Sequence, residues 1–251
     1  MMRIDVSFTP QSLTQKKVDG RQIVAIDVLR ASSTMVTALA NGARGIVPVA
    51  EPSQAVEVRT KLGAEHVLLG GERGGIKIEN FDLGNSPLEY TRDIVGGKVI
   101  AMCSTNGTAL FTLFRYSGPV LVVCFLNLSA VCREIVEEKS DLALLCAGDE
   151  GDYSSEDALC AGALIDKLAD TPLDEISMND SAKLALLHYN ASRERLADSL
   201  RESAHGRELA ALGFGEDITF VSEIDRYNIA PCFESGQIVL KETVSESGPK
   251  L

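Results

Sequence analysis

The sequence predicts an α/β fold, with a largely parallel or mixed sheet and helices on both of its faces. Short apolar segments rich in Val, Ile and Leu alternate along the chain with longer segments that have helical spacing. The apolar segments are continuous rather than alternating, as is typical of strands that are buried on both faces. Several helical segments end at or near a glycine, which favours helix termination. This order is typical of repeated β-α-β units.

Six strands are predicted in the first part of the chain, each a short run of mostly apolar residues. They cover residues 22–27, 45–49, 66–70, 98–102, 120–124 and 142–146. The segments that follow four of these strands predict helices, which cover residues 32–42, 53–63, 106–116 and 128–139.

The pattern becomes mainly helical after the sixth strand. Asp180 is predicted as the N-cap of a helix over residues 181–203, and a shorter helix is expected from about residue 205. Segments 217–225 and 236–242 predict strands that return to the sheet.

The whole pattern indicates one domain over residues 1–242, or two closely packed α/β subdomains within it, and a disordered tail at 243–251. The chain has 251 residues, of which 45% are hydrophobic, so it can bury a sizeable core. No apolar run reaches the roughly 18 residues that a membrane helix needs. The first residues also lack the pattern of a signal peptide. We therefore expect a cytoplasmic protein without a membrane partner.

The net charge of −12 argues against binding to nucleic acid, because no block of basic residues is available to contact a phosphate backbone. An anionic ligand must instead be held by a local site. The six cysteines form no C-x-x-C pair, so a zinc ribbon is not indicated. We expect them to behave as small buried hydrophobic residues.

Polar side chains follow five of the predicted strands. Because the carboxyl ends of parallel strands meet at one edge of a sheet, these side chains are expected to converge on one rim. The five groups are Asp27 with Arg30, then Glu72 with Asn85 and Ser86, then residues 104–108, then Asn127, and finally the acidic stretch 149–157.

The segment Ser104, Thr105, Asn106, Gly107 and Thr108 has the composition of an anion site at the start of a helix. Its polar side chains can cap the helix, and the glycine lets a ligand approach the backbone amides. The alternative is a well-capped helix with no ligand. No Walker A sequence and no G-x-G-x-x-G occurs, so nothing in the sequence supports nucleotide binding.

The acidic residues have two interpretations. Asp27 and a carboxylate from 149–157 could bind a hard cation such as Mg²⁺. Ser154 and Asp157 also match a capping box, so part of the acidic stretch is expected to serve as a helix cap. His205 is the best histidine candidate for proton transfer or phosphate contact, because it lies in a polar segment beside Arg207.

Six motifs, in order and spacing, resemble the 2-phosphosulfolactate phosphatase family, the ComB-type enzymes of coenzyme M biosynthesis. The motifs are VAIDVLRASSTMVTALANGA, FDLGNSPLEY, STNGT, the F-L-N at 125–127, CAGDEGDYSSEDALCAG and SAHGRELAALGFGEDI. The resemblance covers about residues 3–240. It implies a Mg²⁺-dependent acid phosphatase that converts 2-phospho-3-sulfolactate into 3-sulfolactate and phosphate, with an α/β fold of its own. Two departures, Ser104 and the run YSSED, preserve the polar chemistry.

A mechanism follows from this resemblance and the site chemistry. Asp27, Asp149 and Glu156 are the predicted Mg²⁺ ligands, with Glu156 the first choice from the acidic stretch. The 104–108 amides with Arg30 and Arg207 are predicted to hold phosphoryl and sulfonate oxygens. The predicted catalytic residues are Asp27, Arg30 and His205, the last as proton donor to the leaving alkoxide.

Either water or the Asp27 carboxylate could attack phosphorus. We favour water, because Leu29 stands where a haloacid-dehalogenase-like phosphatase has a second Asp. The predicted substrate-binding residues are Glu72, Asn85, Ser86, Ser104, Thr105, Asn106, Gly107, Thr108, Asn127 and Arg207.

Three alternatives remain open at the level of sequence. The substrate could be another 2-phosphorylated hydroxy acid. The protein could be a non-catalytic binder of a small phosphorylated or sulfonated acid, which metal dependence would exclude. A phosphotransferase or lyase would share the same site. The expected partner is a small-molecule phosphate ester, and we expect a homo-oligomer, with a dimer as the working assumption.

Overall fold

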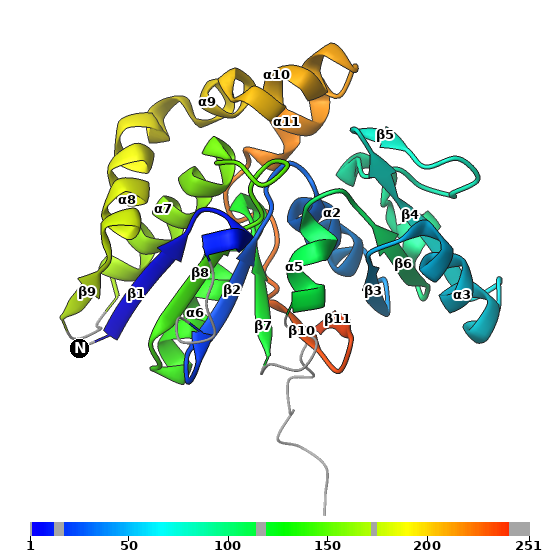
Figure 1. Cartoon of the computed structure of the whole chain (residues 1–251), viewed down its shortest axis with the longest axis horizontal. Helices are drawn as coiled ribbons and strands as arrows, with labels where there is room; N and C mark the ends of the chain where they lie inside the picture. The colour runs from blue at the N-terminus through cyan, green and yellow to red at the C-terminus, as the bar shows by residue number, and fades with distance from the viewer. Residues whose placement is uncertain (1, 13–17, 114–118, 172–174, 241–251) are drawn as a thin grey trace, which may run out of the picture.

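The structure is a computed structural model that describes residues 2–12, 18–113, 119–171 and 175–240. The described strands form one sheet in the order β5-β4-β6-β3-β11-β10-β7-β2-β8-β1-β9, and helices pack around it (Figure 1). The predicted α/β fold with a mixed sheet is confirmed. The predicted disordered tail lies outside the described residues. No helix in the described part of the chain is long and apolar enough to cross a membrane.

All six predicted strands are present, and the structure adds others. The strands are β1 (Met2–Ser7), β2 (Gln22–Ile26), β3 (Gly45–Val49), β4 (Val67–Arg73), β5 (Ile76–Lys77), β6 (Val99–Cys103), β7 (Val120–Val123), β8 (Leu142–Cys146), β9 (Ile176–Met178), β10 (Pro231–Glu234) and β11 (Gln237–Leu240). Strands β1 and β9 were not predicted, because β1 contains two charged residues and β9 is only three residues long. Both pair in parallel at one edge of the sheet.

The helices follow most of the strands. They are α2 (Ala31–Ala40), α3 (Pro52–Leu62), α4 (Arg92–Val95), α5 (Gly107–Leu113), α6 (Leu128–Glu138), α7 (Ser155–Ala169), α8 (Asp180–Ser192), α9 (Leu196–Glu202), α10 (Ala204–Ala211) and α11 (Gly215–Val221). Short 3₁₀ turns cover Pro10–Ser12, Pro87–Glu89, Phe125–Asn127 and Arg193–Arg195. In Figure 1, α8 to α11 form an arch along one side and over the top of the sheet.

Three predictions in the C-terminal part were wrong. Segment 217–225 was predicted as a strand, but α11 covers its first residues. Ile218 and Val221, three residues apart, both enter the core, and this spacing suits a helix better than a strand. The N-cap of α8 is Asn179 rather than Asp180, because the Asn179 side chain accepts the amide of Ala182 at 2.8 Å. The single predicted helix is also interrupted by the 3₁₀ turn before α9.

Apart from the short edge strand β5, which pairs antiparallel with β4, the sheet consists of two parallel groups joined by the antiparallel hairpin β10–β11. Strands β4, β6 and β3 pair in parallel in one group. Strands β7, β2, β8, β1 and β9 pair in parallel in the other. The hairpin lies between β3 and β7 and pairs antiparallel with each. The C-terminal end of the described chain therefore connects the two groups.

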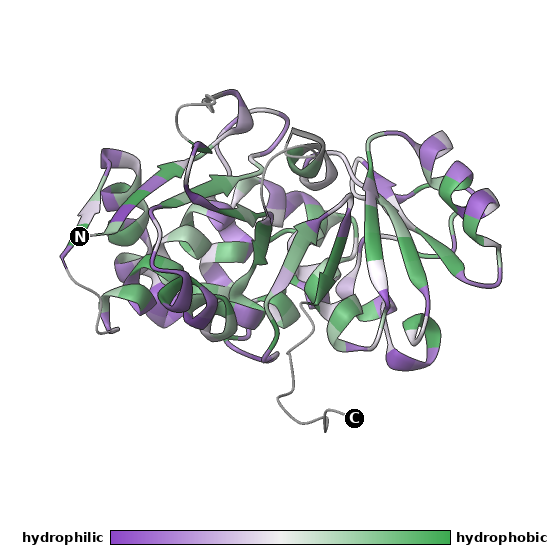
Figure 2. Cartoon of the chain, turned by 90° about the horizontal axis from the view of Figure 1, so that it is seen from below, coloured by the Kyte–Doolittle hydropathy of each residue, from purple (hydrophilic) through white to green (hydrophobic). Residues whose placement is uncertain are grey.

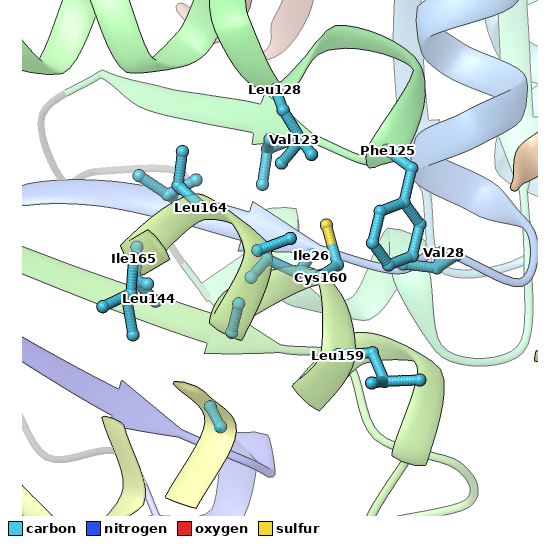
Figure 3. Packing of buried hydrophobic residues seen from close by; sticks show 14 of the residues in the cluster. Ile26, Val28, Val123, Phe125, Leu128, Leu144, Leu159, Cys160, Leu164 and Ile165 are labelled. Carbon is cyan, nitrogen blue, oxygen red and sulfur yellow. The ribbon is translucent and has the colours of Figure 1, made fainter. Parts of the chain in front are cut away.

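Both faces of the central strands are buried. Along β2, Val24 and Ile26 enter one apolar cluster, whereas Ile23 and Ala25 enter another on the opposite face. Figure 3 shows the first cluster, where Ile26 packs near Cys160 and Leu164 of α7. In Figure 2 the strands are mostly hydrophobic, whereas hydrophilic residues are frequent on the outer helices. All six cysteines are buried, as predicted.

Candidate active site

A cavity of about 390 Å³ lies where the loops after β2, β4, β6 and β8 meet helix α10. Nine of the predicted site residues line it. They are Asp27, Arg30, Glu72, Asn85, Ser104, Thr105, Asn106, Asp149 and His205. The convergence expected from the strand ends therefore holds for four of the five loops.

The fifth loop contributes no lining residue, because Asn127 serves the fold instead. This side chain is fully buried. Its Oδ1 accepts the amide of Cys124 at 2.9 Å, while Nδ2 donates to the carbonyl oxygens of Val122 and Ile229 at 3.1 and 3.2 Å. Asn127 thus joins the loop after β7 to the segment before β10.

Arg207 also lies outside the cavity wall. It is two residues after His205 on α10, and residues at that spacing point in different directions from a helix. Its guanidinium is exposed and donates to the carbonyl oxygen of Glu202. Glu208, three residues after His205, does line the cavity. The i, i+3 spacing was the signal in the sequence that could have identified it.

Asp27 is buried at the end of β2, with 6% of its surface exposed. Its Oδ1 accepts the amide of Ala31 at 2.9 Å. Burial raises the pKa of the Asp27 carboxyl to about 6, against the opposing effects of this amide and of His205. The carboxylates of Glu72 and Glu156 add to the increase. Asp27 therefore changes its charge near neutral pH, which is typical of a functional carboxyl group.

Gly107, the first residue of α5, packs directly against Asp27. A Cβ atom at this position would overlap the Asp27 carboxylate and the Cβ of Ala31. The glycine therefore permits the 104–108 segment to approach β2. Thr108 is buried behind it, where its amide donates to Ser104 Oγ at 3.0 Å.

We expect Gly107→Ala to reduce catalytic turnover by about tenfold to a hundredfold, because displacement of the Asp27 carboxylate by a fraction of an ångström misaligns the site. The measurement is the steady-state rate of phosphate release. Gly215→Ala is the matched control, since a Cβ atom there meets nothing within 4 Å. Equal rates for the two variants would contradict the close approach of α5 to Asp27.

Glu72 occupies part of the predicted anion site. Its Oε1 accepts the Thr105 amide at 2.7 Å, and its Oε2 accepts the Gly75 amide at 2.9 Å. The Thr105 hydroxyl also donates to Oε2 at 3.2 Å. Glu72 therefore fixes the loop after β6 to the β4–β5 hairpin, and the Thr105 amide already has an acceptor.

The predicted helix cap in the acidic stretch is present, although the capping box is not complete. Ser154 is the N-cap of α7 and accepts the amide of Asp157 at 3.2 Å. The Asp157 carboxylate does not complete the capping box. It accepts the amides of Val28 and Gly148 at 2.8 and 3.2 Å instead, and so joins the loops after β2 and β8. Burial raises the pKa of Asp157 well above its usual range.

Glu156, the first choice for a metal ligand from this stretch, is 3% exposed and does not line the cavity. Burial raises the pKa of its carboxyl group. Asp149 does line the cavity, in a tight turn in which it pairs with Asp152. Asn106 Nδ2 donates to Asp149 Oδ1 at 3.3 Å, and Asn106 Oδ1 accepts the Glu150 amide at 3.2 Å. Asn106 therefore fixes the acidic turn.

Among the described residues, one group of side chains has the spacing of a metal site. Asp149, His205 and Glu208 each offer one ligand atom, and these atoms lie within 4.8 Å of one another. His205 Nδ1 is 3.7 Å from Asp149 Oδ1 and 3.9 Å from Glu208 Oε2. Both separations fit ligands of one ion, which lie at most about 4.2 Å apart at Mg²⁺ bond lengths. His205 Nδ1 is also buried without a hydrogen-bond partner in the described structure.

The charges around the cavity are unbalanced. Six carboxylate residues line it, namely Asp27, Glu72, Asp149, Glu150, Asp152 and Glu208. Arg30 is the permanent cation among the described lining residues, and its guanidinium already pairs with Asp217 at 2.9 Å. Ser86 Oγ donates to the other Asp217 oxygen at 2.6 Å and is not in the wall. Without added cations, this cavity would repel an anion.

A family model described as 2-phosphosulpholactate phosphatase matches residues 7–236 of the chain. The chain belongs to this family. The resemblance predicted from the six motifs is therefore confirmed.

Individual relatives agree over nearly the full length. A protein of Pseudothermotoga lettingae is 41% identical over 237 residues, which cover 94% of this chain and 98% of that protein. A protein of Caldanaerobacter subterraneus subsp. tengcongensis is 38% identical over 228 residues, covering 91% and 94%. A protein of Clostridium perfringens strain SM101 is 37% identical over 252 residues, covering 100% and 99%. Each is named a probable 2-phosphosulfolactate phosphatase.

The 2-phosphosulpholactate phosphatase family bears the name of a phosphoric monoester hydrolase. The substrate in that name carries phosphate, sulfonate and carboxylate groups, all of them anionic. The substrate in that name is therefore a highly charged anion, whereas six carboxylate residues and one arginine line the cavity of this chain.

Proposed function

We propose that this protein is a Mg²⁺-dependent phosphatase that hydrolyses 2-phospho-3-sulfolactate to 3-sulfolactate and phosphate, as in coenzyme M biosynthesis. The main support is a combination of family and charge. The chain belongs to a family named for this phosphate ester, and its cavity is lined by six carboxylate residues and by an arginine whose guanidinium is already paired. Divalent cations would reverse the repulsion that this arrangement imposes on an anionic ester.

The residues present fit a divalent ion. Asp149, His205 and Glu208 form the group with suitable spacing, and Asp27 lines the same cavity. Carboxylate oxygens are the ligands that Mg²⁺ prefers, whereas the imidazole nitrogen also suits Mn²⁺. A bound ion would polarise the phosphoryl group and offset its charge.

Side chains of the cavity wall can bind the anion and transfer protons. Arg30 has a planar guanidinium that matches a phosphoryl or sulfonate group. Asp27, ionised above about pH 6, can bind a cation or accept a proton from the attacking water. His205 has two alternative roles. Its Nδ1 faces two carboxylates and can bind an ion beside them, or the imidazole can remain free of the ion and hold a proton on Nε2 for the leaving alkoxide.

The test of the substrate is phosphate release from racemic 2-phospho-3-sulfolactate, from 2-phospholactate and from phosphoglycolate at equal concentrations with Mg²⁺. We expect fast release from the sulfonated ester alone. Similar rates on all three esters would support phosphatase activity but contradict 2-phospho-3-sulfolactate as the specific substrate. Binding of the sulfonated ester without release of phosphate would indicate a non-catalytic binding protein and contradict the proposal.

We expect the affinity for Mg²⁺ to be nearly constant above pH 6 and to fall by up to tenfold per pH unit below it. The pKa of Asp27 is raised to about 6, so protons compete with the ion for this carboxylate mainly below that pH. Isothermal titration of the metal-free protein between pH 5 and pH 8 measures this. Asp27→Asn should flatten the dependence. An affinity that rises on acidification would contradict the role of Asp27.

A further inference from the structure

The Arg30 guanidinium is held by three separate parts of the chain. Nη1 donates to Asp217 Oδ2 at 2.9 Å, and Nη2 donates to the carbonyl oxygen of Gly75 at 2.7 Å. The guanidinium carbon lies 4.1 Å from the centre of the Phe214 ring, within the range of a cation–π contact. The loop after β2, the β4–β5 hairpin and the start of α11 therefore meet at one side chain.

Asp217 is itself fixed and lies behind the wall of the cavity. It is 2% exposed and does not belong to the lining residues. Ser86 Oγ donates to Oδ1 at 2.6 Å, while Oδ2 accepts Arg30. One carboxylate oxygen thus accepts a neutral hydroxyl donor, and the other accepts a cationic guanidinium. Because Asp217 does not line the cavity and Arg30 does, Arg30 is the side chain through which Asp217 can position a ligand.

Arg30 retains donors for a ligand. A guanidinium carries five N–H groups, and the contacts with Asp217 and Gly75 use two of them. The side chain also lines the cavity, as do Asp27 and Glu72. A guanidinium released from Asp217 could pair with either of these carboxylates, which would hide its remaining donors from an anion.

We propose that Asp217 is a positioning residue for the anionic substrate. It fixes the Arg30 guanidinium against the Phe214 ring and away from Asp27 and Glu72, so that the free N–H groups face a phosphoryl or sulfonate group. The identity of the substrate rests on the proposed function. The positioning of Arg30 for an oxyanion does not depend on which ester is hydrolysed.

The test is a double-mutant cycle with Asp217→Asn, Arg30→Met and the double variant. The readout is the dissociation constant of inorganic phosphate and of 3-sulfolactate, measured by isothermal titration with Mg²⁺ present, together with kcat and KM. We expect each single variant to weaken binding of at least one probe by roughly tenfold to a hundredfold. The double variant should bind as weakly as Arg30→Met and no more weakly, because Asp217 acts through Arg30.

Two further variants complete the experiment. Ser86→Ala removes the hydrogen bond from Ser86 to Asp217 and disturbs the core less than Asp217→Asn. It replaces Asp217→Asn if that variant does not fold. It should weaken binding severalfold in the wild-type background and not in the Arg30→Met background. Asp198→Asn, an exposed position on α9, is the control and should bind both probes as the wild type does.

The outcomes separate the two proposals. Losses that multiply in the double variant would show that Asp217 acts independently of Arg30 and would overturn the positioning role, whatever the activity. If the wild-type protein binds the probes but releases no phosphate, the proposed reaction is wrong. The binding measurements of the double-mutant cycle would still test the role of Asp217. Unchanged binding in Asp217→Asn would also overturn the positioning role.

Discussion

Asp27→Asn should reduce Mg²⁺-dependent phosphate release by roughly 10³-fold or more, a loss typical of a residue at the reacting centre. Asparagine has nearly the same shape as aspartate and can still accept the Ala31 amide, which lies 2.9 Å from Oδ1. The substitution therefore removes the charge and preserves the local fold. Both roles open to Asp27, as a metal ligand and as the group that accepts a proton or attacks phosphorus, require that charge.

The measurement is kcat for 2-phospho-3-sulfolactate at saturating Mg²⁺, with circular dichroism to verify the fold. Asp198→Asn makes the same chemical change at an exposed position and should retain wild-type turnover. A variant at position 27 with near-normal kcat would remove Asp27 from the mechanism. Water would then need a different base among the cavity carboxylates.

The same substitution should stabilise the metal-free protein. The pKa of Asp27 is 3.8 in its reference state and about 6 when folded, mainly because burial disfavours its charge. The folded state therefore binds this proton more tightly, and the free energy of unfolding falls as the pH rises from about 4 to 6. Two pKa units correspond to about 3 kcal/mol, which the wild type loses above pH 6. Asparagine avoids this loss.

We expect the melting temperature of metal-free Asp27→Asn to exceed that of the wild type by several degrees at pH 7.5, and the difference to shrink near pH 4. Saturating Mg²⁺ should reverse the order, because the ion stabilises the wild type more strongly than the variant. An equal or lower melting temperature for the variant at pH 7.5 without metal would contradict the cost assigned to the buried Asp27 carboxylate.

Local sequence patterns predicted the strands that form the centre of the sheet. Continuous apolar runs such as β2 and β8 are short, buried on both faces and followed by polar loops. Their hydrophobic pattern therefore matches their central place in the sheet. The same reasoning failed for α11, where Ile218, Thr219 and Val221 favour a strand locally. Tertiary packing of Ile218 and Val221 against the core overrides that preference.

The candidate site was predictable where it depends on strand ends and not where it depends on distant partners. Asp27, Ser104 and Asp149 follow strands, and the structure brings them into one cavity. The pairing of Arg30 with Asp217 joins residues 187 positions apart, and no local pattern specifies it. Asn127 resembled a ligand-binding residue because it follows a strand, but its hydrogen bonds satisfy the backbone.

We propose that this acidic cavity is a metal-dependent phosphatase site. The most direct test is phosphate release from 2-phospho-3-sulfolactate by protein treated with EDTA, before and after addition of excess Mg²⁺ or Mn²⁺. We predict almost no release from the treated protein and full recovery with the ion. Rapid release that EDTA leaves unchanged would contradict the claim, because the carboxylates around the cavity would then have to accommodate the anion without a cation.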